Sequence, residues 1–532
     1  MWDTITISTP VSAIEDFERL IAPTGFIFAS AEPTFRANFC RDAAEAALDL
    51  LPTGFLPENI SKRIILSIAE LQGMETNLTS EEEPGRAHHE YRNAQQIEGE
   101  SVSAESKEIL KILGPKFGGD EHAMTYYGSA DATQLYVKLI GAHCRTFGKD
   151  ILTTSYINKK SQPSTIKESL YKALTYLETQ LTHSKSGFFE FQTTNPYSIE
   201  TKSHANQTWK DSPTSLIDTE GNLPNYDAPI AVIAIQGLTY DALQVGIELF
   251  AKENSTDAAR WTLLAAQLQQ QLLDQFWMPD EQYFAVAFDY DREQKMRQIK
   301  TCTSDAGILL NTQIFDSLEE SERLKYIVPT IKKLMSSEFL TDAGIRCRAL
   351  STPDPEFWDY HGRLASWPKE TYDIACGMHR QGFSSCAKQL ENRLLNAVNI
   401  AGCHAELFYV ADDGTVIYNP RSKGTRVAPA EKIAEVTQAW TISAAIAIKI
   451  RNGATKANTS EETLTTIHAE NIKNPTQNNM FNKIEQDILT NIPHIEILDT
   501  AEAIKKATPA DTYTIDVVEA LRLKTAFLKK DY

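Results

Sequence analysis

Apolar residues recur every three to four positions through most of the chain, which is the pattern of helices that bury one face. Eleven such segments can be delimited: 40–51, 60–71, 130–148, 165–181, 228–252, 256–276, 304–315, 318–335, 366–383, 385–402 and 430–451. We expect Pro329 to kink the eighth segment, because proline removes a backbone hydrogen bond inside a helix. Alternation typical of strands is confined to short pieces such as 406–419. The pattern therefore predicts an all-α fold.

The connections between these segments alternate in length. Within successive pairs they are short (52–59, 149–164, 253–255, 316–317 and 384), and between pairs they are long (72–129, 182–227, 277–303, 336–365 and 403–429). Short connections join antiparallel neighbours, and long ones in a compact domain usually carry function. This rhythm predicts a toroid of six helical hairpins, an (α/α)6 barrel with its long loops on one rim. A generic helical bundle is the alternative.

Three regions are expected along the chain. Residues 1–34 form an N-terminal extension, residues 35–451 form the catalytic barrel, and residues 452–532 form a linker and a C-terminal helical segment. The linker at 452–477 is polar and rich in turn residues, whereas 479–529 resumes helical patterning. Because eleven barrel helices are one short of six hairpins, this tail could complete the barrel or pack outside it.

Charge and composition exclude several classes of partner. The net charge is −19 and no cluster of Lys and Arg stands out, which argues against a nucleic-acid groove and an anionic membrane surface. No stretch approaches the roughly 18 apolar residues of a membrane helix, and the first twenty residues lack the pattern of a secretory signal. Seven Cys without close pairs are typical of reduced thiols. We expect a cytoplasmic protein that is monomeric or weakly homo-oligomeric.

We expect no cofactor and no transition-metal site. The sequence contains neither CxxC nor HExxH. His88 and His89 are adjacent, which is poor geometry for binding one metal ion jointly.

Aromatic and acidic residues collect in the long loops. Five stretches illustrate this: "EEEPGRAHHEYR" (81–92), "TYYGSADAT" (125–133), "NQTWKDS" (206–212), "FWDYHGR" (357–363) and "HAELFYV" (404–410). Flat rings stack on the apolar face of a pyranose, while charged and amide groups hydrogen-bond its hydroxyls. The mixture predicts a carbohydrate as the partner.

Asp211 and Glu406 are the carboxyl pair best suited to chemistry on a sugar. Glycoside hydrolysis needs one acid to protonate the leaving oxygen and one carboxylate on the other face of the ring. Trp209, two residues before Asp211, could supply an apolar wall that keeps this acid protonated near neutral pH. Glu406 also has an apolar setting, between Ala405 and Leu407. With 71 Asp and Glu in the chain, however, a carboxylate beside an aromatic residue is common.

Structural explanations exist for several of the same residues. Asp42 at the start of a helix could only complement the helix dipole, worth about 0.3–1 kcal/mol. Trp367 precedes Pro368 at a plausible helix start, and Trp440 lies within a helix, so both could be core. Ser129 could be an N-cap, and residues 81–86 could be a solvated charge run with a turn.

Eight motifs in one order carry a family resemblance. They read "CRDAAEAAL", "EEPGRAHHEYR", "YYGSADATQLY", "NQTWKDS", "AIQGLTYDA", "YHGRLASWPKE", "AELF" and "TQAW", spread from about residue 35 to 450. In this respect the chain resembles the amylo-α-1,6-glucosidase family, the glucosidase part of glycogen debranching enzymes. Its wider relatives are (α/α)6-barrel glycosidases, among them glucoamylases and trehalases. The tail after 452 and most of 1–34 lie outside the resemblance.

The resemblance implies roles for individual residues. Asp211 matches the general acid, and Glu406 matches the general base that activates water. The substrate-binding positions that it implies are Arg41, Asp42, Tyr127, Asp131, Trp209, Lys210, Gln236, His361, Trp367 and Trp440. It further implies an inverting, exo-acting hydrolase that releases a terminal glucose from an α-glucoside. The two carboxyl groups should then lie roughly 6.5–9.5 Å apart.

Departures from the family pattern fall beside these positions and leave the substrate open. Thr208 replaces Gly, Gly362–Arg363 replaces Asn-Gly, Lys369–Glu370 replaces His-Asp, and Ala234–Ile235 replaces Glu-Val. Alternatives are therefore the same fold acting on another sugar or small glycoside, such as trehalose, glucosylglycerate or a mannoside. A non-catalytic carbohydrate-binding relative and a helical scaffold for protein partners are the others.

Overall fold

The computed structural model describes residues 12–353, 360–417, 434–453 and 475–492. Its α-helices are α1 (Ala13–Leu20), α2 (Cys40–Leu50), α3 (Glu58–Leu71), α4 (Ala104–Leu113), α5 (Ala132–Phe147), α6 (Ile166–His183), α7 (Pro196–Thr201), α8 (Ile233–Phe250), α9 (Ser255–Gln275), α10 (Asp305–Ile308), α11 (Glu320–Leu334), α12 (Pro368–Arg380), α13 (Ser384–Ala401), α14 (Ala439–Arg451) and α16 (Pro475–Thr490). Strands are short and subordinate to these helices.

The strands are β1 (Asn38–Phe39), β2 (Glu90–Asn93), β3 (Gln96–Ile97), β4 (Glu100–Ser101), β5 (Ala123–Tyr126), β6 (Ser155–Ile157), β7 (Pro163–Thr165), β8 (Ala231–Val232), β9 (Trp277–Met278), β10 (Tyr283–Phe284), β11 (Ala287–Tyr290), β12 (Met296–Ile299), β13 (Leu340–Thr341), β14 (Gly344–Ile345), β15 (Ala365–Ser366), β16 (Phe408–Val410) and β17 (Val416–Ile417). They form three-stranded sheets in the orders β1-β2-β5, β12-β11-β8 and β15-β16-β17, and four two-stranded ribbons. All the named pairs are antiparallel.

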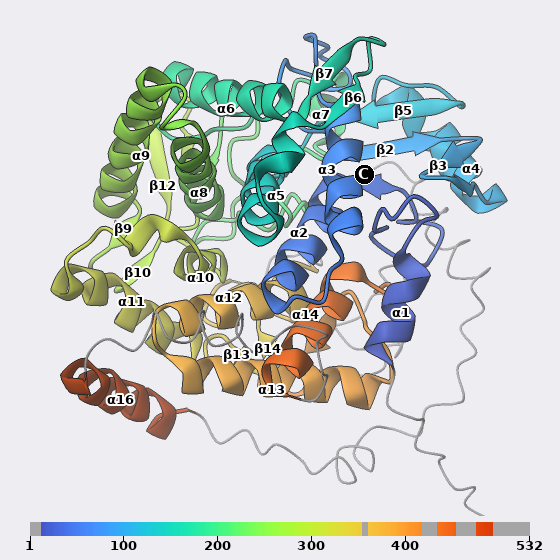
Figure 1. The fold of residues 1–532 in the computed structure, drawn as a ribbon. Coiled ribbons are helices and arrows are strands. Elements are labelled where there is room, and N and C mark those ends of the chain that lie inside the picture. Colours follow the sequence, from blue (N-terminus) through green and yellow to red (C-terminus); the bar gives the residue numbers. More distant parts are fainter. Residues whose placement is uncertain (1–11, 354–359, 418–433, 454–474, 493–532) are drawn as a thin grey trace, which may run out of the picture.

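Six helices close an inner ring. In order around it, α2 contacts α5, α5 contacts α8, α8 contacts α10, α10 contacts α12, α12 contacts α14, and α14 returns to α2. They surround the centre of the molecule in Figure 1. This closed order is the inner layer of an (α/α)6 toroid, as the loop rhythm predicts.

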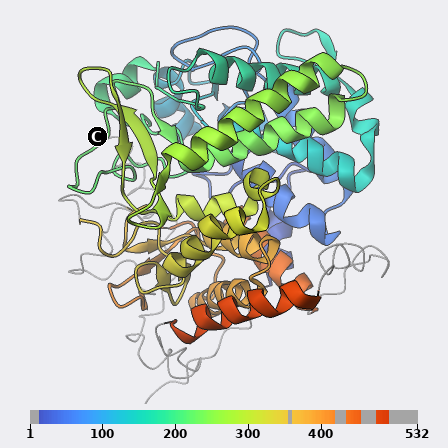
Figure 2. The ribbon, with the colours of Figure 1, turned by 90° about the vertical axis from the view of Figure 1, so that its left-hand side faces the viewer.

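An outer helix packs against each inner one. The hairpin pairs are α2–α3, α5–α6, α8–α9, α10–α11 and α12–α13, and α14 packs against α1 from the start of the chain. Figure 2 shows the antiparallel α8–α9 pair side by side. Within the part of the tail that is described, α16 packs against α13, on the outside of the ring.

Inner and outer helices differ in how apolar residues are distributed. In α8 nearly every residue is buried, as expected for a helix enclosed on all sides. In α9 the buried residues form one stripe, with Ala258, Trp261, Ala265, Leu268 and Leu272 at helical spacing. In an outer helix such as α9, the sequence therefore shows the alternation of apolar and polar faces that is typical of amphipathic helices.

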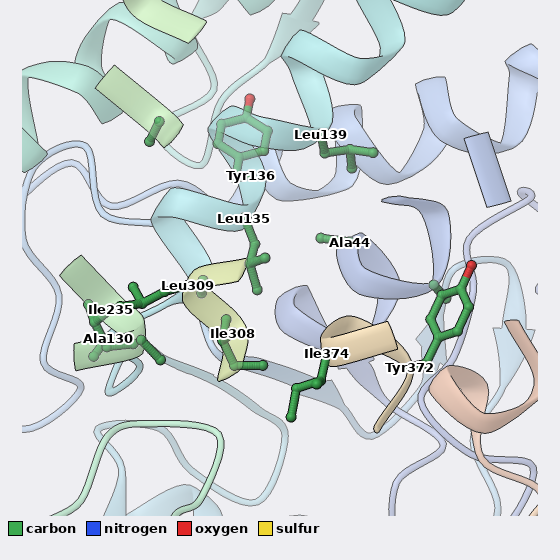
Figure 3. Packing of buried hydrophobic residues seen from close by; sticks show 14 of the residues in the cluster. Ala44, Ala130, Leu135, Tyr136, Leu139, Ile235, Ile308, Leu309, Tyr372 and Ile374 are labelled. Atoms are coloured by element: carbon green, nitrogen blue, oxygen red, sulfur yellow. The ribbon is translucent and has the colours of Figure 1, made fainter. Parts of the chain in front are cut away.

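The centre of the ring is filled by interlocking apolar side chains. Figure 3 shows Leu135 from α5, Ala44 from α2, Ile235 from α8, Ile308 from α10 and Ile374 from α12 in one packed region. All five are buried. Close packing of these side chains fixes the relative positions of the inner helices, and so of the residues at their ends.

The amino-terminal ends of the inner helices lie beside the short strands. β1 and β8 end directly before α2 and α8, and β15 ends one residue before Trp367, the N-cap of α12. Arg41 and Asp42 lie in the first turn of α2, and Asp131 is the N-cap of α5. The sequence motifs therefore gather on one rim.

Each of the eleven predicted segments contains a helix, with three differences. The segment 304–315 is a four-residue helix followed by two 3₁₀ turns, and the helix predicted from about 228 begins at Ile233, after β8. In the last segment α14 begins at Ala439, residues 434–438 are not helical, and 430–433 lie outside the described residues. Helix α11 continues through Pro329. The sequence pattern did not predict α1, α4 or α7, which are ten residues or fewer. The predicted helical stretch at 514–530 also lies outside the described residues.

Candidate active site

A buried aromatic cluster occupies the rim where the inner helices begin. Its core includes Trp209, Trp367 and Trp440, from three separate regions of the chain. The rings of Trp209 and Trp367 lie 5.4 Å apart between centroids, and those of Trp367 and Trp440 lie 5.8 Å apart. His361 stacks on Trp367 at 4.7 Å and meets Trp209 edge-on at 5.5 Å. Four predicted binding residues are thus brought together.

Asp211 lies at one side of this cluster, half-buried between buried neighbours. Tyr360, which packs against the cluster, donates its hydroxyl to Oδ1 of Asp211 at 2.6 Å. The negative charge of Asp211 also contributes to raising the pKa of Arg41. Asp211 is therefore a carboxyl group with access to solvent, beside a phenol and a guanidinium group.

Glu406 is also half-buried, and it lies next to Leu407, a member of the same cluster. Its backbone N–H donates to the carbonyl of Glu435 at 2.8 Å, and the N–H of Glu435 donates to Glu406 Oε2 at 3.1 Å. The indole N–H of Trp440 points to the Glu406 carbonyl at 3.4 Å. These contacts fix both the backbone and the carboxylate of Glu406.

Arg41 and Asp131 form a buried ion pair that joins α2 to α5. Arg41 Nε and Nη2 both lie 2.8 Å from Asp131 Oδ1, and Nη2 also donates to Ser129 Oγ at 3.0 Å. Burial opposes the charge on Arg41, but the attraction of Asp131 prevails and raises its pKa. The guanidinium group is thus held charged and in one orientation beside Asp211.

Asp42 is a buried carboxyl group on the same rim. Gln438, the N-cap of α14, donates its amide to Asp42 Oδ1 at 3.2 Å. Burial raises the pKa of Asp42 to about 7, although the charge of Arg41 opposes the rise. A hydroxyl-binding role and a role at the helix dipole are both compatible with this position.

Lys210 points away from solvent into a buried network. Its ammonium group lies 2.6 Å from Asp305 Oδ2 and 2.9 Å from Glu370 Oε1, and it donates to Ser304 Oγ at 2.8 Å. Burial raises the pKa of Glu370 to about 7, with Lys210 opposing the rise and Asp305 adding to it. These buried contacts fix Lys210, and with it the backbone next to Asp211.

A second buried lysine, Lys369, lies at one of the departures from the motifs of the family that the sequence resembles. Lys369 pairs with Glu45 at 3.0 Å and with Asp373 at 2.9 Å. Its ammonium group is 5.4 Å from the centroid of the Trp209 ring, and that of Lys210 is 5.1 Å away. The Lys369–Glu370 pair that replaces His-Asp thus supplies charges to two internal networks, and the ring of Trp209 packs near both ammonium groups.

Besides Lys210, two more of the predicted binding residues bond to groups outside the aromatic cluster. Tyr127 is buried, and its hydroxyl donates to the Leu71 carbonyl at 2.7 Å and accepts from Lys159 at 3.0 Å. Gln236 uses its amide to bond the backbone of Phe189 in both directions. Neither belongs to the aromatic cluster, so both hold neighbouring loops in place.

Tyr360, Glu435 and Gln438 were not among the predicted site residues. Tyr360 precedes His361, and Gln438 is two residues before Trp440, so both lie inside motifs that the sequence does display. No pattern distinguishes Glu435 from the other acidic residues. Its position follows only from the pairing of the two loops.

The described residues contain no group of three or more His, Cys, Asp or Glu that could hold a metal ion. None of the helices in the described ranges is long and apolar enough to span a bilayer. The separation of roughly 6.5–9.5 Å between the carboxyl groups of Asp211 and Glu406 stays a prediction.

Solved structures share this architecture at low sequence identity. The GH63 mannosylglycerate hydrolase from Thermus thermophilus in complex with Tris has a TM-score of 0.51 and 13% identity, over 82% of this chain and 98% of that one. The same enzyme in complex with glucose gives a TM-score of 0.50 at 13% identity, with the same coverage. With Tris and D-glycerate it gives 0.50 at 12%, again with the same coverage. No protein-family model and no curated protein matches the sequence. The likeness is one of fold.

Proposed function

We propose that this protein is an inverting, exo-acting glycoside hydrolase that releases a terminal glucose from an α-glucoside. Asp211 would be the general acid that protonates the leaving oxygen, and Glu406 the general base that activates water. One observation carries the proposal. Trp209, beside Asp211, and Trp440, whose indole points to the Glu406 carbonyl, belong to one buried aromatic cluster, although the two acids are far apart in sequence.

Each acid has a polar contact that orients its carboxyl group. Asp211 accepts a hydrogen bond from Tyr360, and Glu406 accepts one from a backbone N–H. Trp209 and Trp440, which keep a little exposed surface, are rings of the kind on which a pyranose stacks, and Trp367, buried against His361, supports them. Arg41 and Asp42 lie on the same rim, where they would hydrogen-bond sugar hydroxyls.

A second candidate is hydrolysis of a mannoside or glucoside of glycerate. It is favoured by the solved structures of similar fold, which are of a mannosylglycerate hydrolase and include complexes with glucose and with D-glycerate. The same two carboxyl groups would serve this reaction. Only the groups that recognise the sugar and the aglycone would differ.

The test is a hydrolysis screen with glycogen limit dextrin, isomaltose, trehalose, maltose, glucosylglycerate and mannosylglycerate. We expect turnover of at least one substrate, release of the inverted anomer by NMR, and a loss of about 10²–10⁴-fold in kcat for Asp211→Asn and for Glu406→Gln. A substrate that binds both variants and the wild type but is never hydrolysed would favour a carbohydrate-binding protein instead.

A further inference from the structure

Tyr360 and His361 contact the side chains of Asp211 and Ser212, which are consecutive residues of one loop. The Tyr360 hydroxyl donates to Asp211 Oδ1 at 2.6 Å, and His361 Nδ1 lies 3.2 Å from Ser212 Oγ. The phenol therefore binds one of the two carboxyl oxygens of Asp211, and His361 contacts the hydroxyl group of the next residue.

Tyr360 is itself held in place by the aromatic cluster. The indole N–H of Trp367 donates to the Tyr360 carbonyl at 3.0 Å. The Tyr360 ring lies 4.1 Å from that of His361 and 6.0 Å from that of Trp367, between centroids. Trp367 is the N-cap of α12, so its hydrogen bond to the Tyr360 carbonyl connects Tyr360 to an inner helix as well as to its own loop.

A phenol at this position would act differently on the two protonation states of Asp211. When Asp211 gives up its proton, the hydroxyl donates to a full carboxylate, and hydrogen bonds of this charge-assisted kind are shorter and stronger than neutral ones. A contact of 2.6 Å lies in the range for such a bond. The phenol therefore favours the ionised acid, which is the form produced when the leaving group is protonated.

We propose that Tyr360 is a positioning residue for the general acid: it binds Oδ1, so that the proton is carried on Oδ2, and it stabilises the carboxylate left after proton transfer. This inference rests on the proposed role of Asp211. It assigns to the tyrosine a function that the sequence motifs do not indicate. The proton passes from Asp211 Oδ2 to the glycosidic oxygen, and the tyrosine keeps its own proton throughout.

The experiment compares Tyr360→Phe with the wild type across pH on whichever glycoside the screen identifies. Without the donor, the carboxylate left after proton transfer is less stable, so the basic limb of the kcat profile should move to higher pH. We expect kcat at the optimum to fall about 10-fold or more, with KM changed less than about twofold, since the bond acts mainly in the transition state. Tyr136→Phe is the matched control, because Tyr136 is buried in α5 and pairs with Ser169. In Tyr136→Phe, both limbs of the pH profile of kcat should stay at the wild-type pH values.

A second measurement does not depend on turnover. In protein labelled with ¹³C at the aspartate carboxyl groups, the Asp211 resonance is the one that disappears in Asp211→Asn. Its chemical shift should change in Tyr360→Phe, which removes the hydrogen bond to this carboxyl group, and should stay unchanged in Tyr136→Phe. An unchanged shift in Tyr360→Phe, or a lower kcat with an unchanged pH profile, would overturn the proposal. If no glycoside is hydrolysed but the shift changes, the contact is upheld and the proposed function is what fails.

Discussion

The ammonium group of Lys210 lies 2.9 Å from Oε1 of Glu370, and both side chains are almost completely shielded from water. Asp305 shares the same ammonium group at 2.6 Å. Two carboxyl groups and one lysine thus meet directly behind the loop that carries Asp211. This arrangement makes the position of Asp211 depend on buried charges.

Lys210→Met should destabilise the protein strongly at pH 8, because it leaves Asp305 and Glu370 buried without their cation. Removing one partner of a buried ion pair costs about 3–5 kcal/mol. Lys332→Met is the control, since Lys332 pairs with Asp487 at the surface, where such pairs contribute about 0–1 kcal/mol. Urea unfolding of both variants checks this. Equal midpoints for the two would contradict a structural role for the Lys210 network.

Glu370 should make stability fall with rising pH. Its pKa in the folded protein is about 7, against an ordinary value of 4.5, so the folded state holds the proton more tightly than the unfolded state. The resulting stabilisation is complete below about pH 4.5 and is lost as pH rises to about 7. It amounts to roughly 3 kcal/mol, at about 1.4 kcal/mol per tenfold change.

Glu370→Gln tests this dependence. The variant should gain stability relative to the wild type between about pH 4.5 and 7, since glutamine cannot ionise. Glu248→Gln serves as a control at an exposed surface pair, and its difference from the wild type should stay flat over that range. Denaturation at several pH values measures both. A flat difference for Glu370→Gln would rule out the raised pKa.

Arg41→Lys should destabilise the rim although it conserves charge. Arg41 uses Nε and Nη2 to reach Asp131 and Ser129 together, and a single ammonium group cannot reproduce that fork. We expect a loss of about 1–3 kcal/mol, the range for hydrogen bonds to charged groups. Arg145→Lys, at an exposed pair with Glu248, should stay within about 0.5 kcal/mol of the wild type. Thermal melts would distinguish the two, and similar melting temperatures would contradict this.

The sequence predicts the ring well because all of its inner helices except α10 have more than ten residues and its loop lengths alternate. What it cannot show is which end of the chain packs against α14, since loop lengths say nothing about the segment before the first helix. The structure has α1 there, and Asp16 of α1 also contacts His404 at 2.8 Å. An eight-residue helix carries too few apolar positions to stand out by periodicity.

The sequence motifs predicted most residues of the aromatic cluster, but not which of the motif residues point away from it. Trp209, His361, Trp367 and Trp440 meet in the cluster because their motifs mark the rim. Tyr127 lies in an equally specific motif, yet it turns to Leu71. A motif fixes the backbone position of a residue, whereas the direction of its side chain depends on neighbours that are distant in sequence.

Helix α16 supplies the cap that α13 lacks in its own sequence. Phe383, the N-cap of α13, makes no side-chain capping bond, and Glu485 of α16 accepts instead from the N–H groups of Ser385 and Cys386 at 2.6 and 3.0 Å. Glu485→Ala should therefore destabilise the protein by about 0.5–2 kcal/mol, the range for a lost cap. Glu485→Gln keeps an acceptor and loses only the charge at the helix dipole, so it should cost about 0.3–1 kcal/mol.

Asn482→Ala is the control for α16, because Asn482 is exposed on the same helix. Alanine there should leave stability within about 0.5 kcal/mol of the wild type. Hydrogen exchange would locate the effect, since loss of the cap should speed exchange at Ser385 and Cys386 before it affects the inner ring. Faster exchange throughout the ring, with no local change at α13, would mean that Glu485 acts on global folding and not as a cap.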